Sequence, residues 1–250
     1  MEERFNTDFI IDYYGVGPDL MVSFPRLMAY LQEASVRHTD STSRPMSWYA
    51  DNGFGFLLTD WDVKVKKYPS LHDRIKIHTW PVFFKGIISE RYFEMRDHGG
   101  GVCAQAVSRW VYTDLKRKRP QKPPEDLING YGEIGPPGFE HSYATPGDFN
   151  GYEKISTNRF TVTRRDTDSN RHVNNVKYIE WAADYIPDEI YETRRVLSAR
   201  AAYKKECVKG EEVFIETYLN RANGAETKSA LRPASNPEII LFEARFEFTA

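Results

Sequence analysis

Polar and hydrophobic positions change period abruptly between Arg165 and Trp181, where the sequence reads RDTDSNRHVNNVKYIEW. In the first part of this stretch, Asp166, Asp168, Asn170 and His172 occupy every second position. Alternate residues of an extended segment face the same side. The pattern therefore predicts that the carboxylate, amide and imidazole of Asp168, Asn170 and His172 point into one small volume.

After this polar run the apolar residues follow helical spacing instead. They are Val176, Ile179, Ala182, Ala183 and Ile186. Asn174 or Asn175 is a natural N-cap for such a helix, and Pro187 closes the segment. We expect a mostly buried helix whose first turn brings unpaired N–H groups and a positive dipole end next to the polar cluster.

The same stretch also has a plainly structural interpretation. The Asp and Asn side chains would then form an Asx-type turn and cap the helix, while His172 would lie satisfied in the core. Taken alone, the triplet of Asp168, Asn170 and His172 favours this structural interpretation. Other features of the chain must therefore decide between capping and chemistry.

The first half of the chain repeats the order of elements predicted for the second half. Residues 5–12 form a predicted strand, and Ser23 with Pro25 in the first turn predicts a helix. Further along, KKYPSLHDRIKIHTW (Lys66–Trp80) matches KKECVKGEEVFIETY (Lys204–Tyr218), and both alternate as strands do. The alignment of the two halves places Phe9 on Phe160, Leu27 on Tyr178 and Tyr30 on Trp181.

Further strands and connections complete two similar units. The pattern predicts strands at residues 87–96 and 102–112, a turn at 97–101, a loop at 223–237 and a last strand at 239–248. Residues 130–151 are rich in Gly and Pro and have no period, so we interpret them as a linker. The expected fold class is α+β, with units at residues 1–129 and 152–250. Each unit has one helix and an antiparallel sheet, and two units side by side can share a continuous sheet.

The repeat also bears on the polar cluster. A cluster needed only for helix capping would be expected in both copies. Under the alignment, however, Asp168, Asn170 and His172 correspond to Gly17, Asp19 and Met21, and Glu206 corresponds to Tyr68. This asymmetry favours a function for the second unit, with the first unit as scaffold or pocket wall.

The composition narrows the class of protein. The chain has 250 residues, a formal net charge of −2, 40% hydrophobic residues and two cysteines. These values suit a globular protein of the reducing cytoplasm and argue against nucleic acid as a partner. There is no apolar run long enough for a membrane span, no secretory leader, no metal-ligand spacing, no phosphate loop and no nucleophile elbow. We therefore expect no membrane association, no metal and no cofactor.

Two stretches of the second half, DTDSNRHVNNVKYIEWAADYIP and YKKECVKG, resemble the acyl-ACP thioesterases of fatty-acid synthesis, in both plant plastid and bacterial members. The pattern D-x-D-x-N-x-H-V-N-N-x-x-Y is specific, and AVSRWVYTDLKRKRP in the first half resembles the family's A-x-S-x-W-V followed by a basic stretch. The resemblance spans nearly the whole chain. It implies a double hot-dog fold forming a pseudo-dimer, and hydrolysis of the thioester between a fatty acyl chain and acyl carrier protein, which ends elongation. Plant members begin with a transit peptide, whereas this chain starts almost at its first strand, which looks bacterial.

The resemblance also implies site residues. The family's catalytic set falls on Asp168, Asn170, His172 and Glu206. One departure is that Val208 and Lys209 separate Cys207 from Gly210, where plant members often have Gly directly after Cys.

Several chemical routes are open to these residues. Glu206 and His172 can activate a water, with the backbone N–H groups of Asn174, Asn175 and Val176 as oxyanion candidates. Asp168 either orients the cluster or attacks the thioester itself. A papain-like arrangement of Cys207 with His172 and Asn170 is a further, less favoured reading, because a lone Cys is more often a small buried hydrophobe.

The remaining expectations concern substrate and partner. The acyl-pocket candidates are Phe54, Phe56 and Trp61 in the first half. Acyl carrier protein is acidic, and the basic docking candidates are Lys64, Lys66, Lys204, Lys205 and Arg200. A homodimer stays open. The alternatives are an acyl-CoA thioesterase of hot-dog fold, a hydratase of that fold class and a non-catalytic acyl-binding module.

Overall fold

A computed structural model describes residues 4–168, 171–222 and 224–249. The chain divides into two compact units. Unit 1 comprises residues up to 59 together with 63–141, and unit 2 comprises residues 60–62 together with those from 142 onward. No helix in the described part of the chain is long and apolar enough to cross a membrane.

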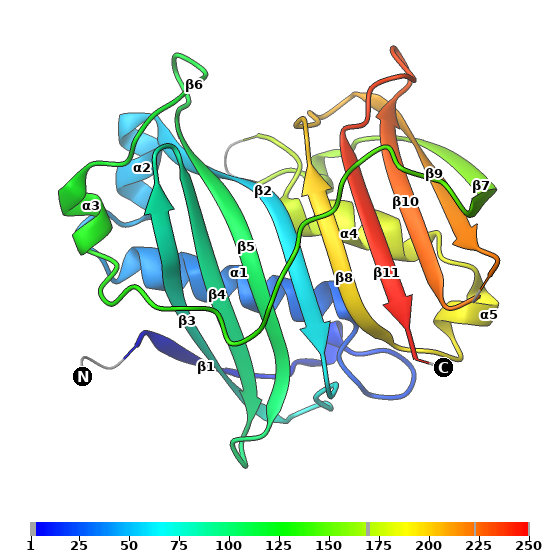
Figure 1. Cartoon of the computed structure of the whole chain (residues 1–250), viewed down its shortest axis with the longest axis horizontal. Coiled ribbons are helices and arrows are strands. Elements are labelled where there is room, and N and C mark those ends of the chain that lie inside the picture. Colours follow the sequence, from blue (N-terminus) through cyan, green and yellow to red (C-terminus); the bar gives the residue numbers. More distant parts are fainter. Residues whose placement is uncertain (1–3, 169–170, 223, 250) are drawn as a thin grey trace. The chain divides into compact units, whose positions relative to one another are not determined.

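Unit 1 is an antiparallel sheet packed on one long helix (Figure 1). The strands neighbour one another in the order β1-β3-β4-β5-β2, and α1 packs against β1 and β3. The elements are β1 (Asn6–Ile10), η1 (Tyr13–Gly15), α1 (Phe24–Asp40), α2 (Met46–Asn52), β2 (Phe54–Val65), β3 (Arg74–Lys85), β4 (Ile88–Asp97), β5 (Val102–Asp114), β6 (Arg119–Pro120) and α3 (Glu125–Asn129).

The helix α1 forms where its cap and its apolar spacing predict it. Ser23 is the N-cap and accepts a hydrogen bond from the Arg26 N–H, and a proline occupies the first turn. Leu27, Leu31 and Ala34 recur at helical spacing and are fully buried. The strands predicted at residues 87–96 and 102–112 are confirmed as β4 and β5.

Unit 2 repeats this plan. Its strands neighbour one another in the order β8-β11-β10-β9-β7, and α4 packs against β9 and β11. The elements are β7 (Tyr152–Thr161), η2 (Arg164–Asp166), α4 (Asn175–Asp184), α5 (Asp188–Tyr191), β8 (Val196–Tyr203), β9 (Glu212–Asn220), β10 (Glu226–Pro233) and β11 (Phe242–Phe248). The core of the unit gathers fully or almost fully buried side chains such as Ile179, Ala182, Ile215, Phe242 and Phe246.

Two details of unit 2 differ from the sequence-based expectation. The helix was predicted to run to Pro187, but α4 ends at Asp184 and Pro187 caps the short helix α5 instead. Residues 223–237 were predicted as a loop, and this is wrong because β10 lies within them and pairs with both β9 and β11.

The strand β10 was missed because its sequence is polar although its position is central. All six residues from Glu226 to Leu231 are buried. The small side chain of Ser229 lets α4 approach closely, and its hydroxyl donates a hydrogen bond to the Ala182 carbonyl, 3.4 Å away. Strand preference depends on such packing more than on the residue type, so composition alone misleads here.

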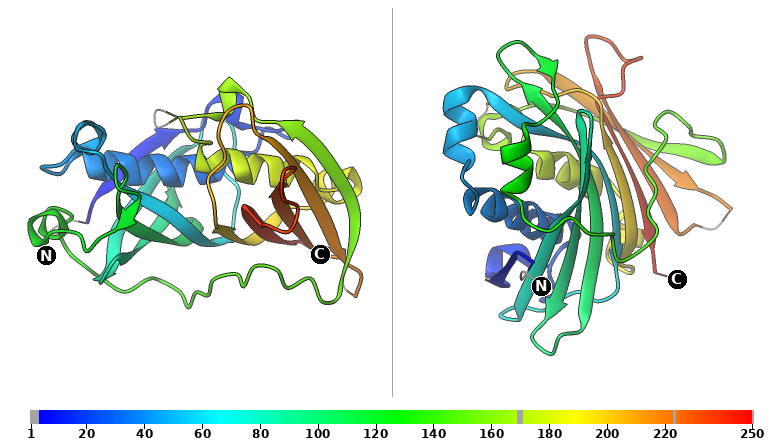
Figure 2. Two further views of the ribbon diagram at one scale, coloured as in Figure 1. Left: turned by 90° about the horizontal axis from the view of Figure 1, so that it is seen from above. Right: turned by 60° about the vertical axis from the view of Figure 1, so that its left-hand side comes forward.

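The segment between the two units contains no helix or strand at residues 130–151. In unit 1 it crosses the face of the sheet opposite α1 (Figure 2). The Gly135 N–H donates to the Pro81 carbonyl at 3.0 Å, and the Trp80 indole N–H donates to the Gly135 carbonyl at 3.2 Å. One backbone hydrogen bond and one from the Trp80 side chain therefore tie the Gly- and Pro-rich stretch to β3.

The internal repeat is confirmed by matching backbone hydrogen bonds. In unit 1 the N–H groups of Lys66 and Lys67 both donate to one carbonyl, that of Cys103, at 2.7 and 3.1 Å. In unit 2 the N–H groups of Lys204 and Lys205 both donate to the Leu241 carbonyl, at 2.8 and 3.1 Å. The two halves therefore share a register residue by residue, as the alignment of the two lysine pairs predicts.

Candidate active site

The described ends of the polar run, Asp168 and residues 171–172, are hydrogen-bonded to each other as in a tight turn. The Asp168 N–H donates to the His172 carbonyl at 2.9 Å, and the Arg171 N–H donates to the Asp168 carbonyl at 3.0 Å. Arg171 has the left-handed backbone that such a turn requires, with φ of 65°. The prediction of an extended run with alternate residues on one side is therefore wrong, because short polar residues favour turns as readily as strand edges. The turn instead makes Asp168 and His172 neighbours across its base, while Asn170 lies outside the described residues.

His172 and Glu206 meet although 33 residues separate them in the sequence. The imidazole Nε2 lies 3.4 Å from the Glu206 Oε2. A backbone bridge between His172 and Val208 and a 3.0 Å hydrogen bond from the Val173 N–H to the Cys207 carbonyl hold the two segments together. Both side chains stay open to solvent, with 41% of the histidine and 50% of the glutamate exposed. An imidazole and a carboxylate in reach of water can share and deprotonate it.

The first turn of α4 follows directly on this turn. Asn174 is the N-cap, and its side-chain oxygen accepts the Val176 N–H at 2.9 Å. The Asn174 N–H donates to the Asp166 carbonyl at 2.9 Å. Of the three N–H groups predicted as oxyanion donors, those of Asn174 and Val176 thus already have acceptors. Within the described ranges, the Asn175 N–H has none.

Part of the polar stretch is structural, as the plainer interpretation expected. Asp166 and Thr163 form a capping box around η2, in which the Asp166 carboxylate accepts the Thr163 N–H at 2.7 Å. Asn174 caps α4. Capping therefore accounts for Asp166 and Asn174, but it does not use the side chains of His172 and Glu206.

Unit 1 contains the same turn without the polar residues. The Gly17 N–H donates to the Met21 carbonyl and the Leu20 N–H to the Gly17 carbonyl, both at 2.9 Å, and Leu20 has a φ of 61°. These bonds match those of Asp168, His172 and Arg171 one for one under the predicted alignment. Because the turn forms with Gly17 and Met21, the backbone does not require the polar set. The asymmetry of the repeat therefore points to chemistry in unit 2.

Two tyrosines that sequence reasoning did not single out, the buried Tyr178 and the partly buried Tyr203, hold this site. The Tyr178 hydroxyl of α4 accepts the Cys207 N–H at 2.8 Å. The Tyr203 hydroxyl of β8 donates to the Asn175 carbonyl in the first turn of α4 at 3.1 Å. The alignment already carried a signal for both, because the matching positions of unit 1 are Leu27 and Val65, which have no hydroxyl.

Cys207 is unsuited to act as a nucleophile. Its side chain is fully buried, and burial raises the pKa of its thiol to about 12, although a hydrogen bond with Tyr178 partly opposes this. The thiol therefore stays protonated at neutral pH, whereas the reactive form of cysteine is the thiolate. Glu206, the neighbour of Cys207, is the residue whose side chain reaches solvent beside His172.

The acyl-pocket candidates lie among aromatic side chains. Phe54 stacks on Tyr112 with ring centroids 5.6 Å apart, and Phe56 contacts the same ring at 5.1 Å. Both are half-buried, and they pack against a buried cluster of Tyr49, Tyr112, Leu127 and Tyr131. Trp61 is almost completely buried. Phe54 and Phe56 thus border an apolar region of unit 1, and Trp61 is a core residue.

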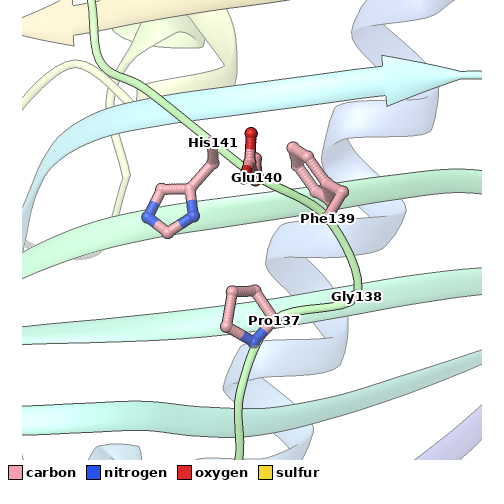
Figure 3. A pocket seen from close by; sticks show the side chains of 5 residues that line it. All are labelled: Pro137, Gly138, Phe139, Glu140 and His141. Atoms are coloured by element: carbon pink, nitrogen blue, oxygen red, sulfur yellow. The ribbon is translucent and has the colours of Figure 1, made fainter.

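An open pocket of about 640 Å³ lies elsewhere in unit 1 (Figure 3). Residues 137–141 of the connecting segment line it. His141 in this pocket contacts the buried Glu90 carboxylate at 3.1 Å, and Arg109 contacts the other oxygen of Glu90 at 3.0 Å. This pocket contains none of the predicted catalytic or acyl-pocket residues.

The docking candidates divide into engaged and exposed side chains. Arg200 lies 3.6 Å from the buried Asp62 carboxylate, and the Lys64 ammonium donates to the Glu140 carbonyl at 3.3 Å. Lys66, Lys204 and Lys205 are exposed. Lys204 and Lys205 directly precede Glu206 in the chain, so they place positive charge beside the His172–Glu206 pair.

Comparison with known proteins identifies relatives over the whole chain. The family model of the acyl-ACP thioesterase N-terminal domain matches residues 2–131, and that of the acyl-ACP thioesterase C-terminal domain matches residues 150–248. The chain is similar to a dodecanoyl-[acyl-carrier-protein] hydrolase of Cinnamomum camphora, with 30% identity over 81% of this chain and 56% of the relative. It is also similar to oleoyl-acyl carrier protein thioesterase 2 of Arabidopsis thaliana, with 28% identity over 83% of this chain and 61% of the relative. The chain thus spans little more than half the length of these plant relatives.

Solved structures agree on the fold. An acyl-ACP thioesterase from Bacteroides thetaiotaomicron covers 98% of this chain, and the chain covers 97% of it, with a TM-score of 0.84 and 19% identity. The 12:0-ACP thioesterase from Umbellularia californica has a TM-score of 0.79 and 21% identity, with 98% of this chain and 96% of that chain covered. These likenesses confirm the predicted α+β double hot-dog fold. The two domain matches show that the chain belongs to the acyl-ACP thioesterase family.

Proposed function

We propose that this protein hydrolyses the thioester of fatty acyl-acyl carrier protein and releases a free fatty acid and the thiol form of the carrier. The observation that carries the proposal is the solvent-open pair of His172 and Glu206, with 3.4 Å between Nε2 and Oε2. The matching positions of unit 1 are Met21 and Tyr68, so the pair is a property of one copy only. Family membership and the activities for which the plant relatives are named support the same reaction.

The pair is suited to general-base attack by water. A water beside the pair hydrogen-bonds to both His172 and Glu206, and the base removes one proton as the water oxygen bonds to the thioester carbon. The oxyanion that forms then accepts a hydrogen bond from the Asn175 N–H. The amide of Asn170 is expected to donate either to His172 or to the substrate carbonyl. When the tetrahedral intermediate collapses, the carbon–sulfur bond breaks, and the proton held by the base neutralises the leaving thiolate.

Asp168 supports either of two routes. In the first it orients His172 from across the turn. In the second its carboxylate attacks the thioester to form an anhydride, which water then cleaves to restore the carboxylate. A single turnover in heavy-oxygen water tests the covalent route. Label in the Asp168 side chain requires an anhydride that water cleaves at the Asp168 carbonyl carbon, whereas direct attack by water labels the released fatty acid and leaves Asp168 unlabelled.

We assign the chemistry to residues 152–250 and the acyl-chain pocket to residues 1–129, joined by the linker at 130–151. Phe54 and Phe56 support this because they border the apolar cluster around Tyr112. Replacing Phe56 with Ala should extend the preferred acyl chain. An unchanged preference over a series of chain lengths would contradict the assignment.

The test of the proposed function is release of free thiol from matched substrates. Acyl-carrier-protein thioesters and acyl-coenzyme A thioesters of the same chain lengths are compared under the same conditions. The proposal expects faster release from the carrier-protein thioesters. Preference for coenzyme A would favour a general acyl-coenzyme A thioesterase, and no release from either would refute hydrolysis.

A further inference from the structure

A buried hydroxyl of unit 2 holds the peptide that follows Glu206. The Tyr178 hydroxyl accepts the Cys207 N–H at 2.8 Å, and both residues are buried. This N–H belongs to the peptide unit between Glu206 and Cys207. The hydrogen bond therefore fixes the backbone directly next to the side chain that contacts His172.

The other backbone group of Cys207 is fixed from the opposite side. Its carbonyl accepts the Val173 N–H at 3.0 Å, and Val173 follows His172 in the chain. Cys207 thus connects α4, through Tyr178, to the turn that carries His172. These two bonds fix the backbone next to Glu206 relative to the backbone next to His172.

Unit 1 shows what the same site looks like without this connection. The position matching Cys207 is Pro69, which has no N–H, and the position matching Tyr178 is Leu27, which has no hydroxyl. The bond to the turn is nevertheless kept, because the Val22 N–H donates to the Pro69 carbonyl at 2.9 Å. The hot-dog unit therefore forms without the bond to the helix. The Cys207 N–H donor and the Tyr178 hydroxyl acceptor occur together only in the unit that carries Glu206.

We propose that Tyr178 is a positioning residue that holds Glu206 against His172 through the Cys207 peptide. This inference rests on the proposed function, in which the His172–Glu206 pair activates the attacking water. A Phe at position 178 would fill the same space but leave the buried Cys207 N–H without an acceptor. The segment with Glu206 would then leave its position for part of the time.

The first test compares Tyr178→Phe with a matched control, Tyr218→Phe. The Tyr218 hydroxyl donates to the Glu216 carboxylate at 2.8 Å and is part of β9 of the same unit. We expect Tyr178→Phe to lower kcat by about tenfold to hundredfold, with KM for the acyl-carrier-protein thioester almost unchanged. Tyr218→Phe should lose a hydroxyl hydrogen bond but keep its kcat. If both variants keep the wild-type kcat, Tyr178 is only a structural residue and the proposal is overturned.

The second test does not depend on activity. Cys103 in unit 1 and Cys207 in unit 2 are both fully buried, so a thiol reagent reaches each only after local opening. We expect Tyr178→Phe to speed labelling of Cys207 by about tenfold, with Cys103 as the unchanged internal reference. Unchanged labelling of Cys207 would overturn the proposal even if activity fell. The two proposals can fail separately. If Tyr178→Phe speeds labelling of Cys207 but the wild-type protein releases no thiol from the thioester, the proposed hydrolysis is refuted, whereas the role of Tyr178 in holding the segment is supported.

Discussion

Replacing Glu206 with Gln separates the chemistry of this residue from its contribution to the fold. Gln keeps the size of the side chain and its reach to His172, which is 3.4 Å from the carboxylate, but it removes the negative charge and the base. General acid–base catalysis typically contributes about a hundredfold to ten-thousandfold to rate. The expected loss in kcat/KM is therefore about 2.7 to 5.4 kcal/mol of transition-state stabilisation.

The expected loss of stability is much smaller. Half of the Glu206 side chain and 41% of His172 are exposed, and such pairs contribute about 0 to 1 kcal/mol to folding. For a chain of this size, 1 kcal/mol corresponds to about 2–4 °C in melting temperature. Glu206→Gln should therefore be almost inactive and almost as stable as the wild type.

A second carboxylate offers a matched control. Glu212 is 51% exposed, pairs with Arg159 at 2.7 Å and begins β9 of the same unit. The assay is thiol release from an acyl-carrier-protein thioester at several substrate concentrations, with thermal unfolding of both variants. Glu212→Gln should keep full activity. Loss of activity in both variants, or a Glu206→Gln enzyme with more than about a tenth of wild-type kcat/KM, would refute the reasoning.

Three further predictions concern other parts of the molecule. Cys207→Ala should keep full thiol-release activity, because the buried thiol is not the nucleophile. The small cavity that it leaves should lower the free energy of unfolding by about 0.5–1.5 kcal/mol. A folded but inactive variant would instead support Cys207 as the nucleophile. Neutralising Lys204 and Lys205 together by Gln should raise KM for the acyl-carrier-protein thioester by about tenfold and weaken its salt dependence, with little change for acyl-coenzyme A. Equal effects on the two substrates would count against a docking role. Burial and the neighbouring Arg91 lower the pKa of His38 to about 3 from an ordinary value of 6.5, so the unfolded chain binds the extra proton between these pH values. The free energy of unfolding should fall by about 1.4 kcal/mol per pH unit as pH drops through this window. Urea unfolding at several pH values measures this dependence, and in His38→Asn the free energy of unfolding should fall less steeply with pH.

The helices of the two units were the most predictable elements. A capping residue followed by apolar positions at helical spacing occurs at Ser23 and again at Asn174, and both helices begin there. Such local signals need no knowledge of distant contacts. The end of α4 was less certain because Pro187 starts a new helix rather than marking the last turn of the old one.

Elements that depend on neighbours were not predictable from their own residues. Strand β10 has a polar sequence although its residues from Glu226 to Leu231 are buried, and its strand partners are β9 and β11 on either side. The sequence from Asp168 to His172 alternates as a strand would. Its described ends are nevertheless hydrogen-bonded as in a turn, with Arg171 in the left-handed conformation. An alternating pattern of short polar residues does not distinguish these two outcomes.

The pairing of His172 with Glu206 illustrates what a spacing argument leaves open. No local pattern places residues so far apart in the sequence within 3.4 Å, and the family resemblance was needed to propose the pair. The internal repeat supplied the evidence that the polar set is functional, because its register predicted which residues of unit 1 replace that set. The same register contained the change from Leu27 to Tyr178 and from Pro69 to Cys207.

The most direct test of the central claim is a double-mutant cycle on His172 and Glu206. The values of kcat/KM for an acyl-carrier-protein thioester are measured for His172→Ala, Glu206→Gln and the double variant. If the two residues activate one water together, the double variant should be no slower than the slower single variant. Losses that multiply, or a single variant with wild-type activity, would contradict the claim that this pair carries out the hydrolysis.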